Sequence, residues 1–291
     1  MNEIYLLVGG EATRLQPLST GVPKALLKVQ GEKIIDLIIQ RFSKFGSFKF
    51  NLICSDKHEK QWIEYKDSSK DDIELLFEKT KLDTAGYIIQ NLNSMPDSFY
   101  CMNGDLLLDI DLQELIIEST TISNSLIGSI EVEDPTRYGV LQVTEENKVE
   151  RFIEKPNDDR FGKKISLGLY HLYKKDLQKI VSVLEIPCSF ERDVFPKLAE
   201  QNLLNTYTAI GKMIDVGTIE SYISSHLNGD TNWISPNNVS LSSSANIKNS
   251  VVLDNCIIED EVIIEDSIIS DGSVIKSGSV IRNQIIRTNL L

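Results

Sequence analysis

The sequence predicts an α/β fold with a mostly parallel sheet, followed by a small parallel β-helix. In the first part of the chain, apolar runs of strand length alternate with segments of helical spacing, which is typical of parallel sheets covered by helices. Toward the end, aliphatic residues recur at every sixth position, which is typical of a β-helix. This change of pattern predicts two domains, over residues 1–230 and 231–291.

The elements of the first domain follow from local patterns. Apolar side chains with helical periodicity indicate helices, and short apolar runs bounded by polar or turn residues indicate strands. Thr84 is expected to cap the third helix. The predicted strands cover 4–8, 49–55, 73–77 and 98–102, and the predicted helices cover 34–45, 58–66, 84–92 and 218–227.

A glycine-containing loop, GGEATRLQPLSTGVPK, directly follows the first predicted strand. Gly9 and Gly10 allow the backbone to approach a ligand closely, because they carry no Cβ atom. Free N–H groups in such a turn, followed by the start of a helix, attract anions. Arg14 and Lys24 add two positive charges. The segment therefore predicts a phosphate-handling loop.

Two well-known phosphate loops are excluded by their spacing. A P-loop requires GxxxxGK followed by Ser or Thr, and the residues after Gly10 are Glu-Ala-Thr-Arg. A dinucleotide-binding loop requires GxGxxG, whose later glycines are missing here. The loop belongs to a different class of phosphate site.

Carboxylates at two later positions are candidate metal ligands. Asp105 follows the predicted strand over 98–102, and ligands of parallel sheets bind at such carboxyl ends. A carboxylate there suits Mg²⁺, which prefers oxygen ligands. Asp109 and Asp111 are interpreted as a turn residue and a helix cap. Asp215, before Val-Gly-Thr, is by itself more typical of a turn or a helix start than of a metal ligand.

The six-residue repeat occupies the end of the chain. Three strands make one coil of a β-helix, so the segment holds roughly three coils, with aliphatic side chains stacked inside. Val239, Ala245, Val251, Ile257, Ile263, Ile269, Ile275 and Ile281 form one column, and Cys256, Val262, Ile268, Val274, Val280 and Ile286 form the column beside it.

Composition narrows the classes of partner and compartment. A net charge of −13 argues against a broad nucleic-acid or anionic-membrane surface. The four scattered cysteines fit a reducing, cytoplasmic environment. No apolar run approaches the roughly 18–20 residues that span a bilayer, and no signal peptide is recognisable. We expect a soluble cytoplasmic protein.

Several motifs, in order, resemble the sugar-1-phosphate nucleotidyltransferase family. The opening loop matches the signature GGxGTRLxPLT followed by PK, with Ala12 in place of a glycine. Further motifs of the family then follow in the family order across nearly the whole chain: NGD, YGV, EKP, FERDVFP, DVGT and the six-residue repeat. The resemblance implies a Rossmann-like catalytic domain followed by a left-handed β-helix.

The family's activity is transfer of a nucleotidyl group from an NTP to a sugar 1-phosphate, with release of pyrophosphate. The resemblance implies that Arg14 and Lys24 bind the triphosphate and that Asp105 and Asp215 bind Mg²⁺. Lys155 would bind the sugar phosphate. Arg14, Lys24 and Asp105 are the expected catalytic residues. The expected substrate-binding residues are Gly9, Gly10, Thr13, Asp83, Thr84, Gly104, Gly139, Glu154, Lys155, Ser166 and Gly168.

Three departures from the family pattern concern specificity: Ala12 in the loop, Asp83 and Ser166. Asp83 stands where the family has glycine, and its carboxylate could accept from a guanine edge or serve as a solvent-facing helix cap. Ser166 replaces an asparagine, which removes an amide from the expected sugar site. FERDVFP resembles members that make GDP-mannose. GTP with mannose 1-phosphate is therefore favoured, and dTTP or UTP with glucose 1-phosphate is the alternative.

Two other functional classes are considered for this chain. A catalytically silent regulatory subunit or sugar-nucleotide sensor on the same fold would be expected to lose the charged residues retained here. A hexapeptide acyltransferase would need a histidine in the repeat, which has none. The last residues, 288–291, would leave an uncapped apolar coil, so a homo-oligomer formed through the β-helix is expected.

Overall fold

A computed structural model describes residues 2–227 and 229–287. Contacts between residues divide the chain into two compact units. The predicted boundary near residue 230 remains a prediction, since this division follows contacts and joins distant segments. The first unit comprises the described residues of Met1–Gly9, Ile39–Gly104 and Leu108–Met213, and the second comprises Gly10–Ile38, Asp105–Leu107 and the described residues of Ile214–Leu291.

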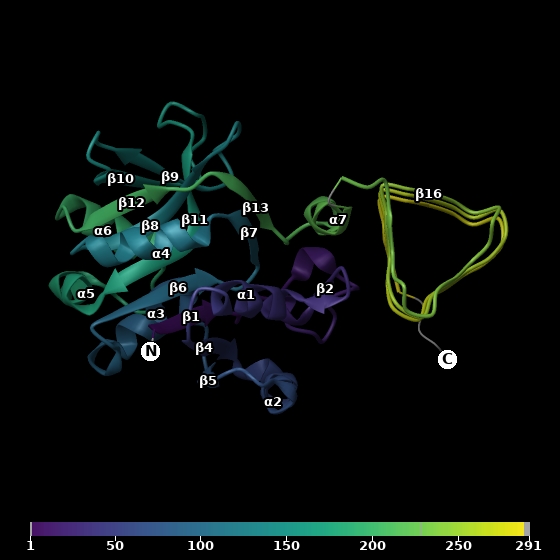
Figure 1. The fold of residues 1–291 in the computed structure, drawn as a ribbon, viewed down its shortest axis with the longest axis horizontal. Coiled ribbons are helices and arrows are strands. Elements are labelled where there is room, and N and C mark those ends of the chain that lie inside the picture. The colour runs from purple at the N-terminus through teal and green to yellow at the C-terminus, as the bar shows by residue number, and fades with distance from the viewer. Residues whose placement is uncertain (1, 228, 288–291) are drawn as a thin grey trace. The chain divides into compact units, whose positions relative to one another are not determined.

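A mixed sheet forms the centre of the first unit, in the order β10-β9-β11-β6-β1-β4-β5, with β8 pairing with both β11 and β12 (Figure 1). The α/β class is confirmed. The strands are β1 Asn2–Leu7, β4 Phe48–Ser55, β5 Ile73–Glu78, β6 Ser98–Asn103, β8 Ser125–Glu131, β9 Gly139–Val143, β10 Val149–Glu154, β11 Lys164–Tyr173 and β12 Leu204–Thr208.

The sheet is parallel on one side and largely antiparallel on the other. Strands β6, β1, β4 and β5 run parallel, as the alternating pattern predicts. Strands β9 and β10 instead form an antiparallel hairpin, and β11 pairs antiparallel with β6 and β8. The hairpin is possible because Asn147 adopts a positive φ of 59° in its turn.

Among the described residues the helices are α1 Ile34–Ser43, α2 Glu59–Ser68, α3 Asp83–Gln90, α4 Leu112–Thr121, α5 Lys174–Ile180, α6 Phe195–Glu200 and α7 Ile219–Leu227. The four predicted helices, over 34–45, 58–66, 84–92 and 218–227, correspond to α1, α2, α3 and α7, and the other three were not among the predicted ranges. Shorter helical turns are η1 Thr13–Leu15, η2 Lys24–Leu26, η3 Asp56–His58, η4 Leu92–Ser94, η5 Val181–Val183 and the π-type turn η6 Phe190–Val194.

Two of the three local assignments at helix ends and turns are wrong. Thr84 lies inside α3 instead of capping it, because the helix begins at Asp83 and Leu82 holds the N-cap position. Asp109 lies in a strand, β7 Leu106–Ile110, and not in a turn. Asp111 does cap α4, since its carboxylate accepts the backbone N–H groups of Gln113 and Glu114.

The expected helix after the glycine loop is absent from residues 10–33. Thr13–Leu15 form only a short 3₁₀ turn, which ends at Gln16 in an extended conformation. Pro17 explains this end, because proline disfavours a helical residue before it and has no N–H for a helix. A hairpin of β2 Lys28–Val29 and β3 Glu32–Lys33 then leads to α1.

The second unit contains a parallel β-helix, whose coils overlie one another as a triangle in Figure 1. Its coil direction was expected to be left-handed, which remains a prediction. Its three sheets are β14 Trp233–Ile234, β17 Val251–Val252, β20 Ile268–Ile269 and β23 Ile285–Ile286; β15 Ser240–Leu241, β18 Ile257–Ile258 and β21 Val274–Ile275; and β16 Asn246–Lys248, β19 Ile263–Glu265 and β22 Val280–Arg282.

The prediction that residues at every sixth position form uninterrupted columns inside the β-helix is wrong in detail. Paired residues of neighbouring coils, such as Ile257 and Val274, are 17 positions apart, except those of β14 and β17, which are 18 apart, so one side of the coil is usually a residue shorter than the repeat. Consequently Ile257 faces outward and is 45% exposed, while Val280 is 54% exposed because the next residue of its strand, Ile281, faces inward. The buried cluster inside the coils consists of Val252, Cys256, Ile258, Val262, Ile264, Ile269, Ile275 and Ile281.

Within the second unit, polar contacts join the β-helix to the preceding segments. The Lys28 ammonium pairs with the Asp254 carboxylate at 2.7 Å. The Tyr222 hydroxyl of α7 donates to the carbonyl oxygen of Lys28, and the Gln30 amide donates to that of His226. Across residues 2–227 and 229–287, no helix is long and apolar enough to cross a membrane. The predicted uncapped end, 288–291, lies outside the described residues.

Candidate functional site

A buried lysine organises the charged group of the second unit. Lys24, in η2, is only 8% exposed, and its Nζ donates to Asp105 Oδ2 at 2.6 Å and to Asp215 Oδ1 at 3.2 Å. Asp105 follows β6, and Asp215 ends the strand β13 Gly211–Asp215, which pairs with β7. The N–H of Val216 donates to the carbonyl oxygen of Asp105, which holds the two carboxylate-bearing segments together. Three residues far apart in sequence thus meet at one cation position.

Gly217 allows this charged group to form, and the sequence interpretation missed its role. A Cβ atom at residue 217 would lie 3.0 Å from Arg14 Nη2, 3.0 Å from Asp215 Oδ1 and 3.3 Å from Lys24 Nζ. A larger residue would therefore make the ends of these charged side chains shift by a few tenths of an ångström. Its position two residues after Asp215, in DVGT, was the available signal.

Arg14 brings a second cation to the group from the 3₁₀ turn η1. Its side chain is exposed, and the distance to Gly217 places its guanidinium beside Lys24 and Asp215. Thr13 is also exposed on this turn. Gly10 has open space around its Cα, since no atom within 4 Å would contact an added Cβ. The loop therefore leaves room for a ligand at its exposed backbone.

The carboxylates of Asp105 and Asp215 fit part of a Mg²⁺ site. Both converge on the Lys24 ammonium, which marks a position where two carboxylate oxygens can reach one cation. Their side chains are 36% and 40% exposed, so solvent and substrate oxygens can complete the coordination. The described residues contain no group of three or more His, Cys, Asp or Glu side chains placed to hold a metal. This arrangement suits Mg²⁺, which commonly binds one or two carboxylates together with water and substrate phosphates.

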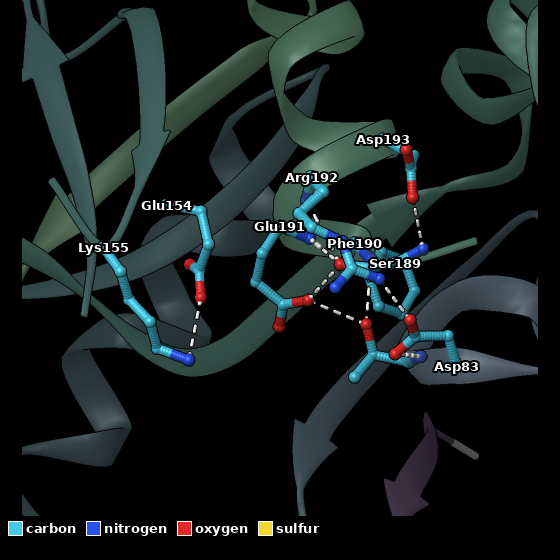
Figure 2. A network of polar contacts seen from close by, with 9 residues as sticks. Asp83, Glu154, Lys155, Ser189, Phe190, Glu191, Arg192 and Asp193 are labelled. Carbon is cyan, nitrogen blue, oxygen red and sulfur yellow. Dashed lines mark hydrogen bonds and ion pairs between the residues drawn. The ribbon is translucent and has the colours of Figure 1, made fainter. Parts of the chain in front are cut away.

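In the first unit, Lys155 and Glu154 form an exposed cation beside a half-buried carboxylate. Lys155 Nζ lies 3.2 Å from Glu154 Oε1, and the lysine side chain is 66% exposed (Figure 2). Burial raises the pKa of Glu154, and the ammonium of Lys155 opposes that rise. Gly139 pairs with Glu154 across β9 and β10, where a Cβ atom would overlap the Phe152 ring. The glycine is thus required for this close approach.

Two further predicted residues lie on β11. Ser166 Oγ accepts the backbone N–H of Gly168 at 3.1 Å, and Gly168 has a positive φ of 65°. The serine hydroxyl thus stabilises a turn in the strand.

Gly104, at the end of β6, donates its N–H to the carbonyl oxygen of Leu7, and a Cβ there would lie 2.4 Å from Val8 Cγ1. The structure therefore shows a packing role for Gly104.

A network links α3 to the turn η6 (Figure 2). The carboxylate of Asp83 accepts the Thr84 N–H at 3.0 Å and pairs with the Arg192 guanidinium, so it is not the solvent-facing cap considered from sequence. Thr84 Oγ1 donates to Glu191 Oε2 at 2.7 Å and accepts the N–H of Phe190 at 2.9 Å. Both oxygens of Asp83 therefore already have partners within the chain.

Glu78 is a candidate binding residue that the sequence interpretation missed. It ends β5, and its Oε2 atom lies 3.6 Å from the Cβ position of Gly9. Its Oε1 atom is buried, and no residue in the described part of the chain forms a hydrogen bond with it. Burial, followed by repulsion from the Asp83 carboxylate, raises the pKa of Glu78 to about 7. The available signal was an acidic residue at the carboxyl end of a predicted parallel strand, as at Asp105.

The predicted site residues thus form two groups, one in each unit. The second unit gathers Arg14, Lys24, Asp105 and Asp215 around Gly217. The first unit holds the remaining predicted residues that lie beyond the loop: Asp83, Thr84, Gly104, Gly139, Glu154, Lys155, Ser166 and Gly168. The first group has the charges for a metal-bound polyphosphate, and the second has an exposed cation and hydrogen-bonding groups.

The α/β sheet, the glycine loop with its two cations and the paired carboxylates are the features expected of a nucleotide-handling protein. The Nucleotidyl transferase family matches residues 5–231, and the chain belongs to this family. The matched range, residues 5–231, includes every residue of the two groups of predicted site residues described above.

Individual relatives agree with the family. "Mannose-1-phosphate guanylyltransferase catalytic subunit beta" of Drosophila pseudoobscura pseudoobscura is 30% identical over 226 residues, which cover 75% of this chain and 60% of the relative. "Probable mannose-1-phosphate guanylyltransferase 1" of Oryza sativa subsp. japonica is 32% identical over 227 residues, which cover 75% and 62%. The chain thus spans about three fifths of the length of these curated relatives.

A solved structure agrees with the fold. HddC from Yersinia pseudotuberculosis superposes with a TM-score of 0.62 and is 25% identical, over 77% of this chain and 98% of that chain. The same protein is also known complexed with GMP-PN.

Proposed function

We propose that the protein transfers a nucleotidyl group from an NTP to a sugar 1-phosphate, with GTP and mannose 1-phosphate as the favoured pair. The convergence of Lys24 with Asp105 and Asp215 carries this proposal, because it combines a buried cation with two candidate metal ligands. The names of the two guanylyltransferase relatives and the GMP-PN complex of HddC support the choice of GTP.

The reaction joins a sugar-phosphate oxygen to the α-phosphorus of the NTP and expels pyrophosphate. Both substrates are polyanions, so catalysis depends on positioning them and on neutralising the charge that develops. Arg14 and Lys24 bind the triphosphate and stabilise the leaving pyrophosphate. Asp105 and Asp215 hold Mg²⁺, which when bound neutralises phosphate charge.

The sugar 1-phosphate binds in the first unit. Lys155 offers an exposed ammonium for its phosphate, and Glu154 and the backbone at Gly139 offer hydrogen bonds to sugar hydroxyls. The Lys155 ammonium already lies beside a carboxylate, so its position is constrained before the substrate arrives. The phosphate itself supplies the nucleophile, and no protein nucleophile is required.

Glu78 is the group proposed to recognise guanine. An ionised carboxylate can accept from both N1–H and the N2 amine of guanine, whereas the uracil or thymine edge also presents carbonyl oxygens. Asp83 was the first candidate for this role, but both of its oxygens have partners in the chain. Glu78 Oε2 lies beside Gly9 at the end of β5, and Oε1 has no hydrogen-bond partner among the described residues, so the side chain is free to turn and present both oxygens to a base.

The direct test is release of pyrophosphate across a panel of NTPs and sugar 1-phosphates with Mg²⁺. We expect turnover with GTP and mannose 1-phosphate, and weaker or no turnover with the other pairs. Turnover restricted to dTTP or UTP with glucose 1-phosphate would contradict the proposed specificity. No turnover with any pair would contradict the activity and favour a silent regulatory subunit.

Replacing Glu78 with glutamine should weaken selection of GTP. At pH 8 we expect kcat/KM for GTP to fall roughly 10–100-fold, because glutamine keeps only one acceptor oxygen, loses the charge and turns N–H donors toward the second guanine donor. The wild-type value should also fall as the pH is lowered through about 7, since protonated Glu78 no longer accepts twice. The measurement is kcat/KM for GTP and UTP between pH 6 and pH 8.

Glu74→Gln on the same strand is the matched control. Its side chain is 48% exposed and pairs with Lys49, so its substitution should leave the ratio of GTP to UTP unchanged. The role of Glu78 is wrong if the ratio and its pH dependence are the same in Glu78→Gln as in the wild type.

We also propose that the protein is a homo-oligomer formed through the β-helix. Outward-facing Ile257 and Val280 give its surface exposed aliphatic groups. Ile257 and Val280 lie in different sheets, so the double substitution Ile257→Asp and Val280→Asp places a charge on each of two faces of the β-helix. It should lower the mass measured by light scattering, because a charge would be buried at whichever face forms the contact. Ile210→Asp, at a residue that is 92% exposed in the first unit, is the control. An unchanged mass of the double variant would contradict this mode of association.

A further inference from the structure

Lys24 occupies the cation position between the two proposed metal ligands. Its Nζ bonds Asp105 Oδ2 at 2.6 Å and Asp215 Oδ1 at 3.2 Å, and the lysine side chain is almost entirely shielded from solvent. The ammonium therefore screens two carboxylates that would otherwise repel each other at close range. A divalent ion placed between the same oxygens would meet the Lys24 charge directly.

We propose that Lys24 is a built-in counterion that competes with the divalent metal and leaves the carboxylates when the triphosphate binds. This inference rests on the proposed metal site at Asp105 and Asp215. The free protein would then bind metal weakly, and the nucleotide and the metal would strengthen each other's binding. Such reciprocity is required whenever two ligands favour the same arrangement of a protein.

The surroundings of Gly217 support a short movement of the lysine. Arg14 Nη2 and Lys24 Nζ lie 3.0 and 3.3 Å from the same Cβ position at Gly217. A phosphate drawn to Arg14 therefore arrives within reach of the Lys24 ammonium. Since glycine has no side chain, nothing from residue 217 stands between the two cations. The ammonium can exchange its carboxylate partners for phosphate oxygens while the metal takes its former position.

Binding of Mn²⁺ to the nucleotide-free protein, measured by electron paramagnetic resonance, tests this competition without turnover. Lys24→Met removes the ammonium with little change of shape, so we expect it to bind Mn²⁺ at least about tenfold more tightly than the wild type. Lys24→Arg keeps the charge and should bind no more tightly than the wild type. Adding Asp105→Asn to Lys24→Met should abolish the gain.

Lys28→Met is the matched control, because Lys28 pairs with Asp254 outside the charged group and should not affect Mn²⁺ binding. If Lys24→Met does not fold, Lys24→Gln provides the same comparison with a side chain that still donates hydrogen bonds to the carboxylates. Equal or weaker Mn²⁺ binding in the folded neutral variant would overturn the inference.

The test separates this inference from the proposed function. Suppose that the wild-type protein releases pyrophosphate, while Lys24→Met binds Mn²⁺ no more tightly than the wild type does. This result would reject the counterion role and leave the proposed activity standing. Tighter, Asp105-dependent Mn²⁺ binding in a protein that turns over no substrate pair would support the counterion role and reject the proposed activity.

Discussion

Asp105→Asn should lower kcat/KM for nucleotidyl transfer by at least about 100-fold, as expected for loss of one preorganised charge-stabilising group. The substitution keeps the shape of the side chain and removes its negative charge. It would weaken a proposed ligand of Mg²⁺ and leave the buried Lys24 with Asp215 as its remaining carboxylate partner in the group. Pyrophosphate release at varied GTP and saturating sugar 1-phosphate measures the effect.

Asp109→Asn is the matched control for this prediction. Asp109 lies four residues further along, in β7, with its side chain 84% exposed and 3.7 Å from Arg41. Its substitution should change kcat/KM by less than about twofold, because exposed ion pairs contribute little. Circular dichroism and thermal unfolding would show that both variants are folded. An Asp105→Asn enzyme with more than a tenth of wild-type kcat/KM would refute the catalytic role of this carboxylate.

Arg14→Ala should also cost at least about 100-fold in kcat/KM. The guanidinium is proposed to bind the triphosphate through several N–H donors and to stabilise the pyrophosphate as it leaves. Arg14→Lys retains the charge without the planar group of donors, so it should recover part of the loss. The measurement is the same pyrophosphate assay, with kcat and KM for the NTP determined separately.

Arg160→Ala provides the comparison for Arg14. Arg160 is exposed and pairs with Asp158 in a loop of the first unit, and its loss should leave kcat/KM near the wild-type value. Near wild-type activity of Arg14→Ala would show that the exposed arginine of the loop has no part in the transfer. A loss of equal size in both variants would point to a general effect of net charge.

Much of the fold could be predicted from sequence because its patterns are local. The helical spacing of Ile34, Ile35 and Ile38 correctly predicts α1, and the apolar run over 49–55 correctly predicts β4. Such patterns record which face of a segment is buried, and this follows from the period of the element itself. The antiparallel pairing of β11 with β6 depends on a distant partner, and no local period specifies it.

The repeat shows where a period misleads. Six-residue spacing correctly predicts a β-helix, but it places Ile257 in the same column as the inward-facing Ile269 and Ile275, whereas the structure exposes Ile257. The cause is the 17-residue coil, in which one side is a residue shorter and shifts the inward position. Only the pairing of successive coils reveals this shift, because a one-residue change reverses the face of a side chain.

The sequence by itself determined the classes of element, and it predicts the phosphate-handling character of the loop that contains Arg14 and Lys24, since both depend on residues close together in the chain. Only the tertiary structure decided which charges meet. Lys24 contacts carboxylates 81 and 191 positions away, and Asp83 pairs with an arginine 109 positions away. Glu78 became a candidate only through burial that raises its pKa to about 7. Electrostatic interactions act through space, so their partners follow from how the chain folds and not from their separation along it.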